Sequence, residues 1–174
     1  MHVLVATDGH LDATTTTNFA ARLAGPDGRV TVLTVVEVPR AFLHDMRVDW
    51  GAPEGTGRLV DDAYVVTPAV PREAPAGWPG DDALIDRYLN DKKEQCTASI
   101  VDILRSADVH THARVVESEN VSLTIINQCA ELGADVVIIG SHGRGLVQGL
   151  LGSNGTKIVR RSPIPVLLIR TTSS

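Results

Sequence analysis

The chain has 174 residues and a formal net charge of −5, and its length is that of a single domain. The acidic balance argues against a protein that coats nucleic acid, because such proteins need a basic surplus to neutralise phosphates. No apolar run approaches the roughly 20 residues of a membrane span, and the opening stretch lacks the basic segment and long apolar core of a signal peptide. We therefore expect a cytoplasmic protein without membrane or nucleic-acid partners.

The first two elements are a strand and a helix. Residues 2–9, HVLVATDG, form a short apolar run that ends in Asp-Gly, which predicts a strand followed by a turn. Asp12 suits the N-cap of the helix that follows, and Gly25-Pro26 suits its end. Four threonines are poor helix formers, so we expect packing to hold this helix through a stripe of Phe19, Ala20 and Leu23.

A second strand over residues 29–38 is nearly continuous in apolar and β-branched residues, which is typical of a strand buried on both faces. Residues 39–81 differ, because they hold six of the nine prolines and both tryptophans. We expect a long inserted loop there, with one short element at RLVDDAYVV, residues 58–66. Trp50 and Trp78 would either pin this loop to the domain or anchor a partner.

The second half of the chain alternates helices and strands. The expected elements are a helix at 82–106, a strand at 109–117, a helix at 120–133, a strand at 135–140, a short helix at 153–162 and a strand at 165–170. Gly133 suits the end of the second of these helices. Helical spacing in the long helix gives an apolar stripe of Ile85, Leu89, Cys96, Ile100 and Ile103. Cys96 and Cys129 lie at apolar helical positions outside any CxxC pattern, so we expect small buried side chains in a reducing compartment.

Strict alternation of strands and helices predicts a single doubly wound α/β domain, in which helices cover both faces of a parallel sheet. A ligand of such a fold sits beyond the carboxyl ends of the strands, where the strand order reverses. Two strand ends stand out chemically, namely Asp8-Gly9 after the first strand and Gly140 after the fourth.

Six glycines lie within residues 140–155, directly before the short helix. Glycines let a backbone approach a ligand closely, and the unpaired N–H groups at a helix start favour an anion. Ser153 is the expected N-cap, and Arg144 and Lys157 would add positive charge. A phosphate-bearing ligand fits, although a flexible surface loop is the alternative. The spacing matches neither a Walker A loop nor the dinucleotide fingerprint.

The segment DVVIIGSHGRGLVQGLLGSNGTKIVRRSPIPVLLIR resembles the universal stress protein family. ATP-binding members carry Gly-x2-Gly-x9-Gly-Ser/Thr, whereas only residues 144–151 separate Gly143 from Gly152 here, one fewer than in that pattern. The opening strand with its Asp extends the resemblance over most of the chain, apart from residues 39–81. The resemblance implies a Rossmann-like, five-stranded parallel sheet of order 3-2-1-4-5 and a homodimer formed through the last strand.

The resemblance also implies ATP, with or without Mg, at the carboxyl edge of the sheet. The candidate nucleotide-binding residues are Thr7, Asp8, Val35, Gly140, His142, Gly143, Arg144, Gly152, Ser153, Asn154 and Gly155. Three departures from the family lie on the phosphate side. They are the shorter glycine spacing, His10 in place of a frequent Ser, and Asn154-Gly155 after Ser153, where family members often have a hydroxyl residue two positions after that Ser.

The expected function is that of an ATP-binding stress-response or regulatory protein with an unidentified protein partner. One alternative is an interaction module of the same fold without nucleotide, which the shorter spacing favours. Another is a slow ATP hydrolase or phosphotransferase, for which Asp8 would be the metal-binding carboxylate. No resident metal is expected, because His110 and His112 share a strand face but have no further ligands at suitable spacing. His142 is expected to contact ligand through its backbone.

Overall fold

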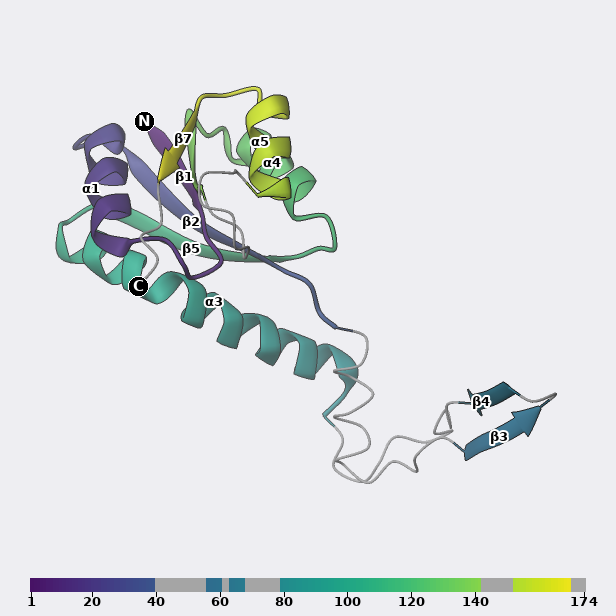
Figure 1. The fold of residues 1–174 in the computed structure, drawn as a ribbon. Coiled ribbons are helices and arrows are strands. Elements are labelled where there is room, and N and C mark those ends of the chain that lie inside the picture. The colour runs from purple at the N-terminus through teal and green to yellow at the C-terminus, as the bar shows by residue number, and fades with distance from the viewer. Residues whose placement is uncertain (40–55, 61–62, 68–78, 142–151, 170–174) are drawn as a thin grey trace. The chain divides into compact units, whose positions relative to one another are not determined.

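A computed structural model describes residues 1–39, 56–60, 63–67, 79–141 and 152–169 (Figure 1). The chain divides into two compact units, one made of Met1–Glu37 with Leu89–Ser174 and the other of Val38–Tyr88. Helix α3 (Asp81–Ser106) begins in the second unit and continues in the first. In the described residues, no helix combines the length and the apolar character that crossing a membrane requires.

The larger unit contains a five-stranded, all-parallel sheet (Figure 1). Its strands are β1 (His2–Ala6), β2 (Arg29–Val36), β5 (His110–Glu117), β6 (Val136–Gly140) and β7 (Val166–Ile169). They lie in the order β5-β2-β1-β6-β7. Numbered among themselves along the chain, these strands have the order 3-2-1-4-5, which confirms the predicted topology.

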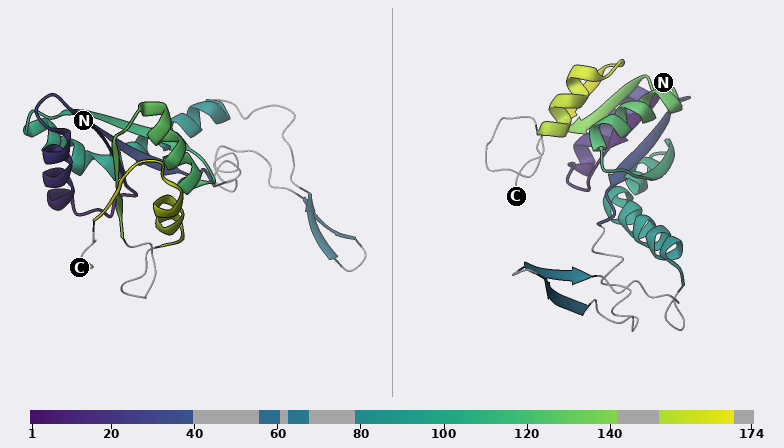
Figure 2. Two further views of the ribbon diagram at one scale, coloured as in Figure 1. Left: turned by 90° about the horizontal axis from the view of Figure 1, so that it is seen from above. Right: turned by 90° about the vertical axis from the view of Figure 1, so that its right-hand side faces the viewer.

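Helices cover both faces of this sheet, as Figures 1 and 2 show. Helix α1 (Ala13–Ala24) and the second half of α3 pack over one apolar cluster, which contains Val3, Val5, Val32, Ile100 and Ile138. Helices α4 (Val121–Leu132) and α5 (Ser153–Arg161) pack over another, which contains Leu4, Leu33, Ile125, Val137 and Ile158. All five residues of β1 are buried, because this central strand has a covered face on each side.

In α1 and α3, some of the residues predicted to be buried are exposed, and other positions around the helix are buried instead. In α1 the side chain of Phe19 is 43% exposed, whereas Thr16 and Thr17 are buried beside Ala20. Thr17 is tolerated inside because its hydroxyl bonds a carbonyl one turn earlier, Thr14 O at 3.1 Å, whereas Thr16 Oγ1 is buried without a hydrogen-bond partner among the described residues. In α3 the predicted Ile103 is exposed, and the buried residues are Leu84, Thr97, Ile100, Val101 and Leu104.

Three of the four predicted helix ends are confirmed, and one of them is the end of α1, where Gly25 is the C-cap. Asp12 caps α1, because its Oδ1 accepts a hydrogen bond from Thr15 N at 2.7 Å. Hydrogen bonding from the Thr15 side chain and then from this N–H lowers the pKa of the Asp12 carboxyl. Gly133 ends α4 with a left-handed φ of 59°. The prediction that Ser153 caps α5 is wrong: Gly152 occupies the N-cap and Ser153 is the first helical residue.

The smaller unit contains an antiparallel hairpin. Its strands are β3 (Thr56–Val60) and β4 (Ala63–Thr67), which form a two-stranded sheet. The sequence predicts one short element at this place, and the structure has two strands. Trp50 and Trp78 lie outside the described residues, so the choice between pinning the loop and anchoring a partner stays open.

Candidate functional site

The strand order reverses between β1 and β6. From β1 the chain adds β2 and β5 on one side, then crosses to β6 and β7 on the other. Val5 pairs with Ile138, so Thr7 and Gly140 each lie two residues beyond that pair at the carboxyl edge. Proteins of this architecture hold ligands at such a point, which makes this edge the candidate site.

The loop after β1 is a turn held by hydrogen bonds between its own residues. Thr7 is buried, and its N–H donates to Leu33 O of β2 at 2.9 Å. Its Oγ1 accepts a hydrogen bond from Gly9 N at 2.9 Å, and Asp8 Oδ1 accepts one from His10 N at 3.2 Å. The turn therefore holds an exposed carboxylate at the sheet edge.

Cys96 of α3 lies against this turn. Gly9 has a φ of 91°, and a Cβ added to it would lie 3.4 Å from Cys96 Cα and 3.6 Å from its Sγ. Cys96 is half-buried, so the expectation of a fully buried side chain is wrong for it. Cys129 is buried as expected, and burial raises the pKa of its thiol to about 11. Helical spacing predicts that Cys96 faces the interior, but it does not indicate which loop Cys96 contacts.

The N-terminus of α5 faces the same edge. Because β7 runs parallel to β6, the helix that joins them starts at the carboxyl edge and returns to the amino edge. Its N-cap, Gly152, makes no side-chain cap hydrogen bond. Thr156 N donates to Gly152 O at 2.9 Å, and the N–H groups of the three residues before Thr156 precede the first helical hydrogen bond.

The structure brings most of the predicted nucleotide residues to one edge. Those within the described residues are Thr7, Asp8, Val35, Gly140, Gly152, Ser153, Asn154 and Gly155. Val35 is half-buried near the end of β2 and packs against the cluster under α4 and α5. His142, Gly143 and Arg144 lie outside the described residues. Nucleotide binding by this set stays a prediction.

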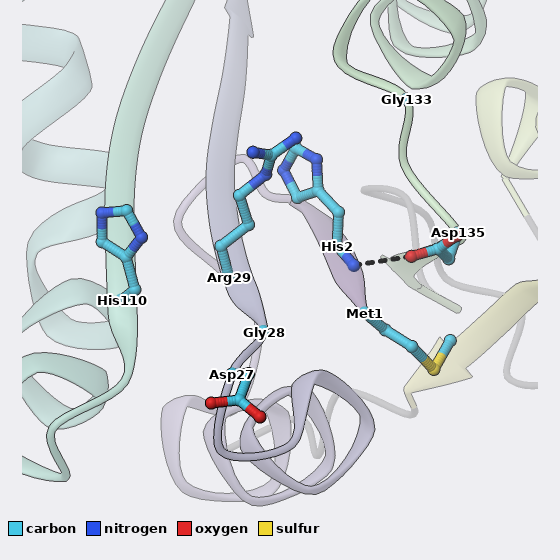
Figure 3. A pocket seen from close by; sticks show the side chains of 8 residues that line it. All are labelled: Met1, His2, Asp27, Gly28, Arg29, His110, Gly133 and Asp135. Atoms are coloured by element: carbon cyan, nitrogen blue, oxygen red, sulfur yellow. Dashed lines mark hydrogen bonds between the residues drawn. The ribbon is translucent and has the colours of Figure 1, made fainter.

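An open pocket of about 380 Å³ lies at the opposite, amino-terminal edge of the sheet (Figure 3). It is lined by Met1, His2, Asp27, Gly28, Arg29, His110, Gly133 and Asp135, none of which is a candidate nucleotide residue. His2 is buried, with Nδ1 3.0 Å from Leu132 O and Nε2 2.9 Å from Thr31 Oγ1. Burial lowers the pKa of the His2 imidazole.

The two histidines considered as a metal pair are both exposed on β5. Within the described ranges, no group of three or more His, Cys, Asp or Glu side chains is placed to hold a metal ion.

The sheet order and the helix start at its carboxyl edge define a doubly wound α/β protein of the kind that holds ligands at a switch point. Within this class the chain belongs to the universal stress protein family, which its sequence matches over residues 1–170. A universal stress protein of Mycobacterium tuberculosis is 30% identical over 142 residues, which are 79% of this chain and 47% of that protein. The chain thus spans about half the length of the curated relatives that match it over most of its own length.

Solved structures share the fold. A universal stress protein family member from Arabidopsis thaliana, solved with AMP bound, has a TM-score of 0.56 and 13% identity, and the match covers 99% of this chain and 93% of that one. A universal stress protein in complex with cAMP has a TM-score of 0.51 and 17% identity, with 99% and 98% of the two chains covered. At these identities the likeness concerns the fold.

Proposed function

We propose that this protein binds an adenine nucleotide at the carboxyl edge of β1 and β6, with a phosphate at the N-terminus of α5. The observation that carries the proposal is the start of α5, whose N-cap is a glycine without a side-chain cap, at the edge where the strand order reverses. The unpaired N–H groups and the helix dipole favour an anion there by about 0.3–1 kcal/mol from the dipole, plus hydrogen bonds.

The bound AMP and cAMP of the two family members support an adenine nucleotide as the ligand class. Within that class we propose ATP, with or without Mg, as the ligand and a stress-response or regulatory role in the cytoplasm. Binding would act as a population shift that changes the surface presented to a partner. If the site binds no nucleotide, the function that remains is that of a protein-interaction module of the same fold.

Thermal unfolding with AMP, cAMP, Mg-ATP and Mg-GTP tests the proposal. Ligand at one hundred times its Kd adds about 2.7 kcal/mol to the free energy of unfolding, which for a chain of this length is a rise in Tm of roughly 5–11 °C. We expect such a rise with at least one adenine nucleotide and a smaller one with Mg-GTP. Unchanged Tm with every adenine nucleotide at millimolar concentration would contradict nucleotide binding.

We further propose a homodimer formed through β7. In the described part of the chain β7 pairs only with β6, so it is an edge strand, and Leu168 on it is 42% exposed. Leu168→Glu should shift sedimentation velocity from dimer to monomer, because it places a charge in the paired edge. Ile103→Glu is the matched control, since Ile103 is also 42% exposed but lies on α3. A wild-type monomer at high concentration would exclude this dimer.

A further inference from the structure

The exposed face of α5 carries positive charge close to the start of the helix. With about 3.6 residues per turn, Ser153, Lys157 and Arg160 lie on one face. All three are exposed, whereas Ile158 on another side of the helix is buried. The helix contains the basic residues Lys157, Arg160 and Arg161 and no acidic residue. Within α5, the cation nearest to the unpaired N–H groups at the helix start is therefore Lys157.

The charge of Lys157 is not neutralised within the described part of the chain. Its ammonium makes no hydrogen bond or ion pair with any residue there. On α4, the helix beside α5 (Figure 1), the acidic residue is Glu131, which is paired with Arg114 at 2.8 Å. Acidic residues at the carboxyl edge, such as Asp8 after β1 and Glu119 before α4, lie on other elements. The Lys157 ammonium is thus available to an anion at the start of α5.

The Lys157 side chain is long enough to reach the helix start. Lys157 lies four residues after Ser153, which is about 6 Å along the helix axis. Helical side chains lean towards the N-terminus, and the four-carbon stem of a lysine spans a comparable distance. The ammonium can therefore lie beside the first turn, next to the N–H groups that precede the first helical hydrogen bond.

We propose that Lys157 makes the site prefer nucleoside di- and triphosphates to a monophosphate. The inference rests on the proposed nucleotide site, in which the N–H groups before Thr156 N hold one phosphate. A monophosphate has its charge at those N–H groups. A longer phosphate chain carries further charge along the exposed face to the Lys157 ammonium, which binds phosphate as a compact point charge. AMP and cAMP, bound in two family members, carry one phosphate each and do not decide this number.

The opposing charge at this edge is that of Asp8. Its carboxylate is exposed and repels a triphosphate more strongly than a monophosphate, so it reduces the preference that Lys157 creates. A divalent cation on the phosphates lessens this repulsion. Because Asp8 is unchanged in every variant below, comparison of the variants isolates the contribution of Lys157.

Isothermal titration calorimetry of the whole chain with AMP, ADP and ATP tests the inference. Each nucleotide is titrated with Mg and with EDTA, and the tighter of the two affinities is compared. Wild type should bind ATP at least about threefold more tightly than AMP, and ADP should lie between them. Lys157→Gln should lower ATP affinity roughly 3- to 10-fold and AMP affinity less than about twofold, as expected for one charged contact at an exposed site. Lys157→Arg keeps the charge and should retain the preference for ATP.

Arg161→Gln is the matched control. It also removes one exposed basic residue of α5. Arg161 lies eight residues after Ser153, about 12 Å along the axis, which exceeds the Debye length of about 8 Å at physiological ionic strength. Its three nucleotide affinities should therefore stay within about twofold of the wild-type values. Far-UV circular dichroism confirms that each variant is folded.

Some results would overturn the inference and leave nucleotide binding in place. Equal loss of AMP and ATP affinity in Lys157→Gln would place the ammonium on the phosphate that both nucleotides share. Equal affinity of wild type for AMP and ATP, or unchanged ATP affinity in Lys157→Gln, would mean that Lys157 does not select the phosphate chain. An equal loss in Arg161→Gln would indicate a general effect of charge. A wild type that binds none of the three nucleotides would instead contradict the proposed function, and this inference with it.

Discussion

At the scale of single residues, His2 links stability to pH. Burial lowers the pKa of its imidazole from the ordinary value of 6.5, so the unfolded chain takes up a proton at His2 before the folded chain does. The free energy of unfolding therefore falls as the pH drops below about 6.5, by at most about 1.4 kcal/mol per pH unit for one proton. The stability that neutral, buried His2 contributes is fully present above that pH.

His2→Gln should lower the free energy of unfolding by about 1–3 kcal/mol at pH 7.5, because the bonds to Leu132 O and Thr31 Oγ1 are disturbed. The difference from wild type should shrink at pH 5, where wild type has lost the contribution of neutral His2. Urea unfolding at the two pH values measures this, with exposed His112→Gln as the control. A difference that is equal at both pH values would contradict the argument.

Gly9 is required by its backbone conformation. Its φ of 91° disfavours a side chain, although a Cβ would make only ordinary contacts with Cys96. Gly9→Ala should cost about 1–2 kcal/mol of stability and weaken nucleotide binding, because it strains the turn that carries Thr7 and Asp8. Gly25→Ala, at a φ of 72° with nothing within 4 Å, should cost similar stability and leave nucleotide affinity unchanged. Urea unfolding and nucleotide titration of both variants separate the effects.

Residue-level features could be predicted where the cause is local. Asp12 and Gly133 were identifiable because capping depends on neighbours in sequence. The contact between Gly9 and Cys96 was not, because it joins a loop to a helix far along the chain. The bonds of His2 to Leu132 and Thr31 were missed for the same reason.

At the scale of elements, strands were more predictable than helix faces. The strands of the parallel sheet are short and mostly apolar runs, so their type and their parallel arrangement follow from composition and alternation, whereas the order 3-2-1-4-5 was implied by the resemblance to the universal stress protein family. The phase of α1 and α3 depends on which side meets the sheet, and a threonine with a bonded hydroxyl can replace a larger apolar residue there. That is why Phe19 and Ile103 are exposed against expectation.

The start of α5 allows a prediction in which stability and affinity move in opposite directions. Gly152→Asp supplies a side-chain cap and should raise the free energy of unfolding by roughly a few tenths of a kcal/mol, because glycine is itself an acceptable N-cap. The same carboxylate occupies N–H groups and repels a phosphate, so nucleotide affinity should fall. Gly152→Asn caps without the charge and should reduce affinity less. If Gly152→Asp leaves nucleotide affinity unchanged, the phosphate does not lie at this helix start.

At the scale of the whole molecule, the parallel sheet and its two apolar clusters are built from residues outside the inserted segment. All five strands of the sheet, and every residue of the two core clusters, lie outside Val38–Tyr88. The sequence marks this segment by its prolines and tryptophans, which is why its position was predictable. Its hairpin was not fully predictable, because a two-stranded sheet has weak sequence signals and marginal stability alone.

Replacement of residues 40–78 by a flexible Gly/Ser linker of about 15 residues, with an r.m.s. span of roughly 20 Å, should therefore leave the parallel sheet folded. Closing a shorter loop gains about 0.6 kcal/mol per halving of its length, so Tm should stay the same or rise by a few degrees. Circular dichroism and thermal unfolding measure this, and the nucleotide-dependent rise in Tm should be retained because the carboxyl-edge residues are unchanged. A shortened chain that folds but has lost that rise would show that the inserted segment belongs to the nucleotide site, whereas an unfolded one would show that the core depends on it.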